Sequence, residues 1–305
     1  MSGRITDVLN QRGVAHRENV SAATLCTFRI GGTVAALVEP RCIGELIQAV
    51  AVCRKENLPY TVIGRGSNLL FDDGRLEVVL ISTTHLTGTR RTDEYSFHVL
   101  CGTSLGALCY RAAAADLSGL EFAWGIPGSV GGAVFMNAGA GPCSMSDVVE
   151  SVEIYDPKDN KIRTLINSQL GFSYRFCNIQ ENGAVLLSAT VKLKESKDFQ
   201  QILAKMNEIA MHRRRTQPLD FPSAGSVFKR HWASQPISRE IDRLGLKGLC
   251  VGGARVSEKH AGFIINQGNA TARDVRTLIA ILQDAVKKNM GFVPTLEIRL
   301  IPEEL

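Results

Sequence analysis

The chain has 305 residues, of which 45% are hydrophobic and 21% are charged, and its formal net charge is +5. This composition supplies enough apolar residues for a sizeable core and excludes a disordered, collagen-like or coiled-coil protein. The length predicts about two domains. Because the positive charge is small, an anionic small molecule is favoured over nucleic acid as the main ligand.

The sequence offers no segment typical of export or of membrane insertion. Residues 1–7 lack the apolar stretch of a signal peptide. An uncharged run over 122–146 contains six glycines and only 13 apolar residues. A spanning helix needs ~20 predominantly apolar residues, so this run has too few apolar residues to form one. We therefore expect a protein of the cytoplasm that does not insert into a membrane.

The cysteines and histidines predict neither disulfides nor a metal site. The eight cysteines are scattered and never form a Cys-x-x-Cys pair, which indicates reduced thiols. The six histidines do not cluster at the spacing of metal ligands. We therefore expect no metal.

Helices and strands are predicted along the whole chain. Apolar residues at Ile43, Leu46, Ile47 and Val50 recur at helical spacing and predict a helix over 43–56. Further helices are predicted at 104–115 and 198–213, and strands at 59–63, 76–82, 97–101, 149–155, 161–165, 184–193 and 293–301. The polar turn at 156–160 makes a hairpin of two of these strands. Because helices and strands do not alternate strictly, we predict an α+β fold.

The strongest helical pattern lies near the C-terminus. Thr271 followed by Asp274 resembles a capping box, and Gly291 suits the end of the same helix. Upstream, three arginines at 213–215 are followed closely by Pro218, which ends a helix and predicts a domain boundary there.

A glycine-rich turn follows the strand predicted at 59–63. Its residues are Gly64, Arg65, Gly66, Ser67, Asn68 and Leu69. Glycines allow backbone N–H groups to close on a pyrophosphate, and Ser67 and Asn68 add polar contacts. Leu69 stands where the Rossmann fingerprint requires a third glycine, and the P-loop lysine is absent. Taken alone, a plain tight turn is the simpler interpretation.

A second glycine-rich segment lies inside the uncharged run. Its candidate residues are Gly125, Ile126, Pro127, Gly128, Ser129, Gly131, Gly132 and Asn137. So many glycines indicate backbone that lies directly against a flat or bulky group, such as a large cofactor. Tight packing of a buried loop explains the pattern equally well.

Three polar side chains have chemistry suited to catalysis. Arg175, between aromatic residues, has the planar fork that binds carboxylate or phosphate, although a surface salt bridge is the simpler interpretation. Ser226, with Lys229 three residues on, has the chemistry of a proton donor, but a structural turn serine is the simpler interpretation. Glu297 lies between apolar residues of a predicted strand, where burial without a partner is costly.

Taken together, the motifs resemble the UDP-N-acetylenolpyruvoylglucosamine reductase (MurB) family. They lie at 27–32, 64–70, 125–137, 174–175, 217–218, 224–229, 245–248 and 257–260, and end at Glu297. Their order and spacing make the resemblance specific over nearly the whole chain. The short spacing between Arg175 and Ser226 is similar to the compact branch of the family, which lacks an extra insert.

The resemblance implies a two-part FAD-binding region of the vanillyl-alcohol oxidase (PCMH) type, followed by a smaller α+β substrate domain. The first would span 1–215, with its core at about 28–195, and the second 216–305. It implies non-covalent FAD held by both glycine-rich segments, with NADPH as co-substrate. The implied reaction reduces the enolpyruvyl group of UDP-N-acetylglucosamine enolpyruvate to UDP-N-acetylmuramate.

The resemblance also implies roles for single residues. Arg175 would neutralise charge that develops at the substrate carboxylate, and Glu297 would act there with it. Ser226 would protonate C2 of the substrate. We infer that the neighbouring cation Lys229 makes this hydroxyl a better acid. The expected substrate-binding residues are Tyr174, Lys229 and Arg230.

The chain departs from the family pattern in three places. Arg230 and His231 replace an Asn-Pro pair, Gly141 replaces a tyrosine, and Cys177 replaces a serine. None of these positions is among the three catalytic candidates.

Two other classes of protein remain as alternatives. One is a flavoprotein of the same fold that oxidises a small alcohol with O₂. The other is a nucleic-acid-binding protein that uses the arginines at 213–215, although no interleaved aromatic residues support base stacking. We expect no nucleic-acid partner, a small-molecule nucleotide-sugar substrate, and a monomer.

Overall fold

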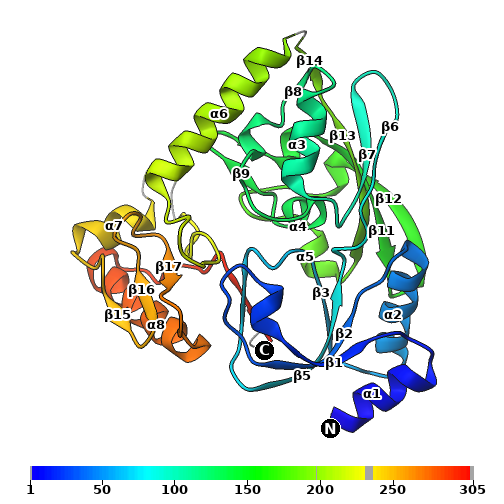
Figure 1. Ribbon diagram of the computed structural model, residues 1–305, viewed down its shortest axis with the longest axis horizontal. Helices are drawn as coiled ribbons and strands as arrows, with labels where there is room; N and C mark the ends of the chain where they lie inside the picture. The colour runs from blue at the N-terminus through cyan, green and yellow to red at the C-terminus, as the bar shows by residue number, and fades with distance from the viewer. Residues whose placement is uncertain (1, 197, 231–235, 303–305) are drawn as a thin grey trace. The chain divides into compact units, whose positions relative to one another are not determined.

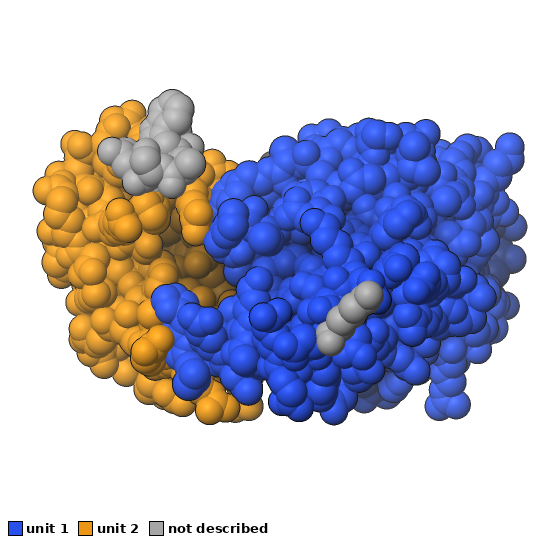
Figure 2. All heavy atoms as spheres, turned by 90° about the horizontal axis from the view of Figure 1, so that it is seen from above, with its two compact units in different colours: residues 1–18, 36–65, 78–212 blue, residues 19–35, 66–77, 213–305 orange. Residues whose placement is uncertain are grey.

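The structure is a computed structural model that describes residues 2–196, 198–230 and 236–302 (Figure 1). It combines helices with several small sheets, which confirms the predicted α+β class. The chain forms two compact units, each made of three stretches of sequence: residues 1–18, 36–65 and 78–212 form unit 1, and residues 19–35, 66–77 and 213–305 form unit 2 (Figure 2). Within the described residues, no helix combines the length and apolar character required to cross a membrane.

The main sheet of unit 1 has five antiparallel strands in the order β12-β11-β13-β7-β6. The bounds are β6 Thr89–Arg91, β7 Ser96–Leu100, β11 Val149–Asp156, β12 Lys161–Ile166 and β13 Val185–Lys192. The central strand β13 is buried over most of its length, and α4 (Val130–Phe135) contacts it. The strands predicted at 97–101 and 184–193 are confirmed. The sheet therefore supports the helix that carries the second glycine-rich segment.

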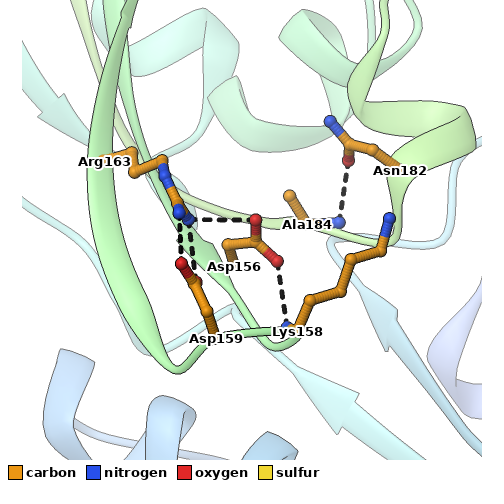
Figure 3. Close-up of polar contacts among 6 residues, drawn as sticks. All are labelled: Asp156, Lys158, Asp159, Arg163, Asn182 and Ala184. Carbon is orange, nitrogen blue, oxygen red and sulfur yellow. Dashed lines mark hydrogen bonds and ion pairs between the residues drawn. The ribbon is translucent and has the colours of Figure 1, made fainter.

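Strands β11 and β12 form the predicted hairpin, and Arg163 closes its turn (Figure 3). The guanidinium Nη1 donates to Asp156 Oδ2 at 3.0 Å and to Asp159 Oδ1 at 2.9 Å. The other carboxylate oxygen of Asp156 accepts from the backbone N–H of Lys158 at 2.9 Å. Both carboxylates therefore hold the polar turn that the sequence predicts.

A second sheet has the order β1-β2-β5-β3, with β1 Arg17–Ser21, β2 Thr33–Val38, β5 Arg75–Ser82 and β3 Tyr60–Ile63. Strands β3 and β5 are parallel. Three of these strands, β1, β2 and β5, contain residues of both units. Helix α2 (Ile43–Lys55) joins β2 to β3 and buries its apolar stripe, which confirms the helix predicted over 43–56.

Unit 2 contains a three-stranded sheet and the long helix α8. The bounds are α7 Ile237–Arg243, β15 Cys250–Val251, β16 Ala254–Val256, β17 Ile264–Asn266 and α8 Ala272–Met290. Helix α8 contacts β15 and β16. Thr271 and Asp274 form the predicted capping box, and Gly291 ends the helix at a φ of 78°. Both ends of α8 therefore follow from local sequence signals.

The turn after β4 (Leu69–Phe71) caps the same helix. Asp73 accepts hydrogen bonds from the backbone N–H groups of Ala272 and Arg273, each at 2.9 Å. A carboxylate at this end also interacts favourably with the helix dipole. Strand β4 pairs in parallel with β18 (Arg299–Ile301). Residues 66–77 are therefore held to the C-terminal part of unit 2 by two separate contacts.

The strand predicted over 293–301 is wrong in its extent. Only β18 at its end is a strand, and Leu296 makes an isolated bridge with Phe228. Glu297 lies in a bend between these two pairings. The chain changes its hydrogen-bonding partner at this point, so one continuous strand cannot form.

The remaining elements connect these sheets. The helices are α1 Ser2–Gln11, α3 Leu105–Ala113, α5 Ile179–Asn182 and α6 Phe199–Thr216; the strands are β8 Leu117–Ser118, β9 Gly139–Ala140, β10 Cys143–Ser144 and β14 Lys194–Glu195. Short 3₁₀ helices span Ala22–Leu25, Glu121–Ala123, Met145–Asp147 and Asn167–Gln169. The helices predicted at 104–115 and 198–213 are confirmed as α3 and α6, and α6 continues to Thr216.

Candidate active site

The two glycine-rich segments meet within unit 1. Strand β3 ends at Ile63, directly before Gly64. A Cβ atom at Gly64 would collide with the hydroxyl of Ser129, which belongs to the second segment. Ser129 is itself buried, so it has little room to move. The absence of a side chain at Gly64 is what allows the two segments to approach this closely.

The second segment has one fixed side and one exposed side. Ser129 Oγ accepts from the N–H of Gly132 at 3.3 Å, and the N–H of Gly131 donates to the carbonyl of Cys101 at 2.8 Å. A Cβ at Gly131 would lie 2.9 Å from Cys101 Cβ. Gly125 and Gly132 are nevertheless exposed. A bare backbone anchored in this way suits a flat group that lies against it.

Arg175 lies in a tight turn, and its backbone is left-handed. Ser173 and Phe176 exchange backbone hydrogen bonds of 3.1 and 3.2 Å around it. The φ angle of Arg175 is 56°, a conformation that non-glycine residues adopt rarely and at a cost in free energy. The guanidinium carbon lies 5.0 Å from the centre of the exposed Tyr174 ring, in reach of a cation–π contact.

Backbone carbonyls just after α4 orient the guanidinium of Arg175. Its Nη2 donates to the carbonyl of Gly139 at 3.1 Å, and its Nη1 lies 3.5 Å from the carbonyl of Asn137. Both acceptors are neutral, so they direct the side chain without cancelling its charge. The structure therefore brings Arg175 and the end of the second glycine-rich segment together.

The side chain of Asn137 is buried and contacts protein through both of its polar atoms. Its Nδ2 donates to the carbonyl of Ser173 at 2.8 Å, and its Oδ1 accepts from the N–H of Ser146 at 2.9 Å. Only 5% of the residue is exposed. Sequence reasoning assigned this asparagine to the cofactor and did not detect its contact with the Arg175 turn.

Ser226 lies in an extended segment of unit 2 that pairs on both sides. Gly225, at a φ of 80°, turns the chain into it. Ser226 forms an antiparallel bridge with Phe263, and the N–H of Glu297 donates to the carbonyl of Val227 at 2.7 Å. The structure therefore brings the backbones of Ser226 and Glu297 into adjacent segments, a pairing that no sequence pattern indicated.

Asn68 connects the first glycine-rich turn to Glu297. The turn passes from unit 1 to unit 2 between Arg65 and Gly66. Within unit 2, Asn68 Nδ2 donates to the carbonyl of Glu297 at 2.9 Å, and the carbonyl of Asn68 accepts from the N–H of Arg299 at 2.9 Å. The bend that contains Glu297 is therefore held on both sides by one residue.

Similarity to known proteins decides the family. Residues 217–301 match the C-terminal domain of UDP-N-acetylenolpyruvoylglucosamine reductase, and residues 34–165 match an FAD-binding domain. A reductase of this name from Petrotoga mobilis is 39% identical over 92% of each chain. One from Pseudothermotoga lettingae is 44% identical over 90% of this chain and 93% of its own. The chain belongs to the UDP-N-acetylenolpyruvoylglucosamine reductase (MurB) family.

A solved MurB structure agrees with this assignment. The crystal structure of MurB from Thermus caldophilus superimposes with a TM-score of 0.79 at 35% sequence identity, and the match covers 94% of this chain and 99% of that one. The FAD-binding match at 34–165 includes both glycine-rich segments. Their bare, anchored backbone fits FAD, the cofactor that this family uses.

The structure explains two departures from the MurB pattern. Cys177 is buried and donates through Sγ to the carbonyl of Phe135 at 3.4 Å, and burial raises the pKa of its thiol. Gly141, at a φ of 63°, lies in the exposed turn between β9 and β10. Arg230 is exposed, and His231 lies outside the described residues. The substitutions at Cys177 and Gly141 therefore fit their local structure, and no structural reason explains Arg230.

Sequence reasoning missed His260 as a support for Ser226. His260 Nδ1 accepts from the N–H of Gly262 at 3.0 Å, and its ring meets that of Phe263 edge-on at 5.0 Å. The carbonyl of Gly262 in turn accepts from the N–H of Val227 at 2.9 Å. Burial lowers the pKa of His260. A neutral imidazole therefore helps to shape the segment that pairs with Ser226.

In the described part of the chain, the cysteines and acidic residues show no metal-binding arrangement. All eight cysteines are free thiols. Among the residues that the structure describes, no group of three or more His, Cys, Asp and Glu side chains is placed to hold a metal ion.

Proposed function

We propose that this chain reduces the enolpyruvyl group of UDP-N-acetylglucosamine enolpyruvate to give UDP-N-acetylmuramate, a precursor of peptidoglycan, with NADPH as the source of hydride. The observation that carries this proposal is similarity to reductases of that name over nine-tenths of the chain. Non-covalent FAD would supply the hydride-transfer chemistry between NADPH and C3 of the enolpyruvyl group. The residues proposed to hold it are Gly64–Leu69, Gly125–Ser129, Gly131 and Gly132.

Arg175 is the proposed site of charge stabilisation. Addition of hydride at C3 leaves negative charge that spreads from C2 onto the substrate carboxylate. A guanidinium already directed by the carbonyls of Gly139 and Asn137 needs little reorganisation to meet that charge. Tyr174, stacked beside it, is a proposed contact for the substrate together with Lys229 and Arg230.

Ser226 is the proposed donor of the proton to C2, and Glu297 acts with Arg175 at the substrate carboxylate. The N–H of Glu297 donates to the carbonyl of Val227, the residue after Ser226. This bond supports a shared role, because it links the backbone positions of Ser226 and Glu297. Lys229 follows on the same extended segment, where its N–H donates to the carbonyl of Thr295 at 2.9 Å. We further infer a monomer that acts in the cytoplasm.

An anaerobic titration of the purified holoenzyme tests the function directly. We expect NADPH to bleach the flavin absorbance near the visible maximum, and the enolpyruvyl nucleotide to restore it. If NADPH bleaches the flavin but the nucleotide does not restore it, the alternative of another FAD-dependent oxidoreductase of this fold is favoured. A protein that cannot be reconstituted with FAD contradicts the proposal altogether.

A further inference from the structure

We propose that Asn137, which the sequence predicts to contact the flavin, is instead a positioning residue for Arg175. This inference rests on the proposed function, because it gives Asn137 a part in the second half-reaction only. The observation behind it is that the side chain of Asn137 bridges two protein segments and is 5% exposed.

The side-chain amide of Asn137 forms hydrogen bonds with the backbone through both of its polar atoms. Nδ2 donates to the carbonyl of Ser173, 36 residues away, and Oδ1 accepts from the N–H of Ser146. The backbone of Asn137 is left-handed, with a φ of 40°, which asparagine tolerates better than most residues. Both the conformation and the hydrogen bonds therefore favour asparagine for reasons internal to the protein.

The contacts of Asn137 reach both the backbone turn and the guanidinium of Arg175. Asn137 holds Ser173, the first residue of the turn, through its side chain, and its carbonyl faces Nη1 of Arg175. Gln180 adds a further contact, since its Nε2 lies 3.3 Å from the carbonyl of Arg175 and 2.6 Å from that of Phe135. Asn137 and Gln180 together therefore hold both the turn and the guanidinium of Arg175.

The turn at Arg175 needs the hydrogen bonds that Asn137 provides. A left-handed arginine is strained and persists only where its surroundings hold it. Loss of the Asn137 amide donor releases the turn at Ser173, so the guanidinium becomes less well placed. A displacement of about 1 Å in a catalytic group is enough to slow a reaction by roughly a hundredfold.

The test is the variant Asn137→Asp in the holoenzyme. Aspartate keeps the size and the tolerance for a left-handed backbone, and it still accepts from Ser146, but its carboxylate cannot donate to Ser173. Anaerobic stopped-flow spectroscopy measures flavin reduction by NADPH and then reoxidation by the enolpyruvyl nucleotide. We expect reoxidation to slow by about tenfold or more, with the flavin spectrum and the rate of reduction unchanged.

A double-mutant cycle separates positioning from general damage. In an Arg175→Lys background, Asn137→Asp should slow reoxidation little further, because its effect acts through the arginine. The matched control is Asn57→Asp, an exposed asparagine with a φ of 53° in the connection between α2 and β3. We expect that control to behave like the wild type in both half-reactions.

Each other outcome overturns the inference. A changed flavin spectrum or slower reduction by NADPH makes Asn137 a flavin contact, and unchanged or additive reoxidation rates remove its link to Arg175. If Asn137→Asp does not fold, Asn137→Gly removes the same amide donor, tolerates the left-handed backbone and carries the same expectation. Failure of the wild type to be reoxidised by the nucleotide instead refutes the proposed function, and the inference with it.

Discussion

The backbone N–H of Glu297 donates a 2.7 Å hydrogen bond to the carbonyl of Val227. Because Val227 directly follows Ser226, this bond ties the two proposed catalytic side chains of unit 2 to adjacent backbone segments. Asn68 holds the other side of the same bend through the carbonyl of Glu297. The proposed proton donor and carboxylate are therefore positioned by main-chain hydrogen bonds, which substitution of either side chain leaves in place.

Loss of the Ser226 hydroxyl should separate the two half-reactions. We expect Ser226→Ala to leave reduction of the flavin by NADPH intact and to lower the rate of flavin reoxidation by the enolpyruvyl nucleotide by about 10²–10⁴-fold, the usual contribution of a general acid. Anaerobic stopped-flow absorbance measures both rates. Ser223→Ala, three residues earlier, is the control. A comparable loss in flavin reduction would refute the role of Ser226 as proton donor.

A methyl group at Gly131 should destabilise the protein, whereas one at Gly132 should not. The new Cβ at Gly131 would lie 2.9 Å from Cys101 Cβ and 3.0 Å from its carbonyl oxygen. At Gly132 the nearest atom outside the helix backbone is Ser129 Oγ at 3.5 Å, an ordinary contact. We expect Gly131→Ala to lower the free energy of unfolding by about 1–3 kcal/mol. Urea denaturation followed by circular dichroism compares the two variants, and equal stability would contradict the packing described.

Protonation of His260 should destabilise the fold at mildly acidic pH. Burial lowers its pKa from the ordinary value of 6.5, so the unfolded chain binds the proton more tightly. The stability that the neutral imidazole provides is thus present above pH 6.5 and is lost as the pH falls below it.

The variant His260→Gln measures this contribution. Its free energy of unfolding should fall less steeply than that of the wild type as the pH drops below 6.5. Thermal melts or urea denaturation at a series of pH values provide the comparison. Identical slopes for His260→Gln and the wild type would show that His260 does not titrate within the fold.

The carboxylate of Asp73 should stabilise unit 2 through the N-terminus of α8. We expect Asp73→Ala to cost about 1 kcal/mol, the usual loss when a capping side chain is removed. Asp72→Ala should cost less, because its ion pair with Arg276 is longer, at 3.6 Å, and is partly exposed. Urea denaturation of both variants decides the order, and an equal or larger loss at Asp72 would contradict it.

The parts of the fold that the sequence predicts well are those with local causes. Helix α8 has a cap residue directly before it and another directly after it in the sequence, and the β11–β12 hairpin follows from a polar turn between two apolar runs. The glycine-rich segments were located because glycine itself carries the signal. Family motifs then supplied candidate residues such as Arg175 that local patterns alone did not favour over simpler interpretations.

The rest depends on contacts between distant residues. The parallel pairing of β18 with β4 joins positions 230 apart, such as Leu69 and Arg299. Because no local pattern indicates this pairing, the bend at Glu297 could not be predicted. The same holds for the contact of Asn137 with Ser173, because no local pattern records which carbonyl a buried amide will meet. The left-handed backbone of Arg175 could not be predicted either, because the aromatic residues around it do not determine its φ angle.

The discontinuity of unit 2 has a consequence for dividing the protein. Its three stretches, 19–35, 66–77 and 213–305, are separated by residues of unit 1. A polypeptide cut at residue 216 would lose β4, leaving β18 without its parallel neighbour, and would lose Asp73 from the start of α8. Recombination between relatives at that position would thus exchange an incomplete module. Transfer of the last ninety residues into another protein would therefore require residues 19–35 and 66–77 as well.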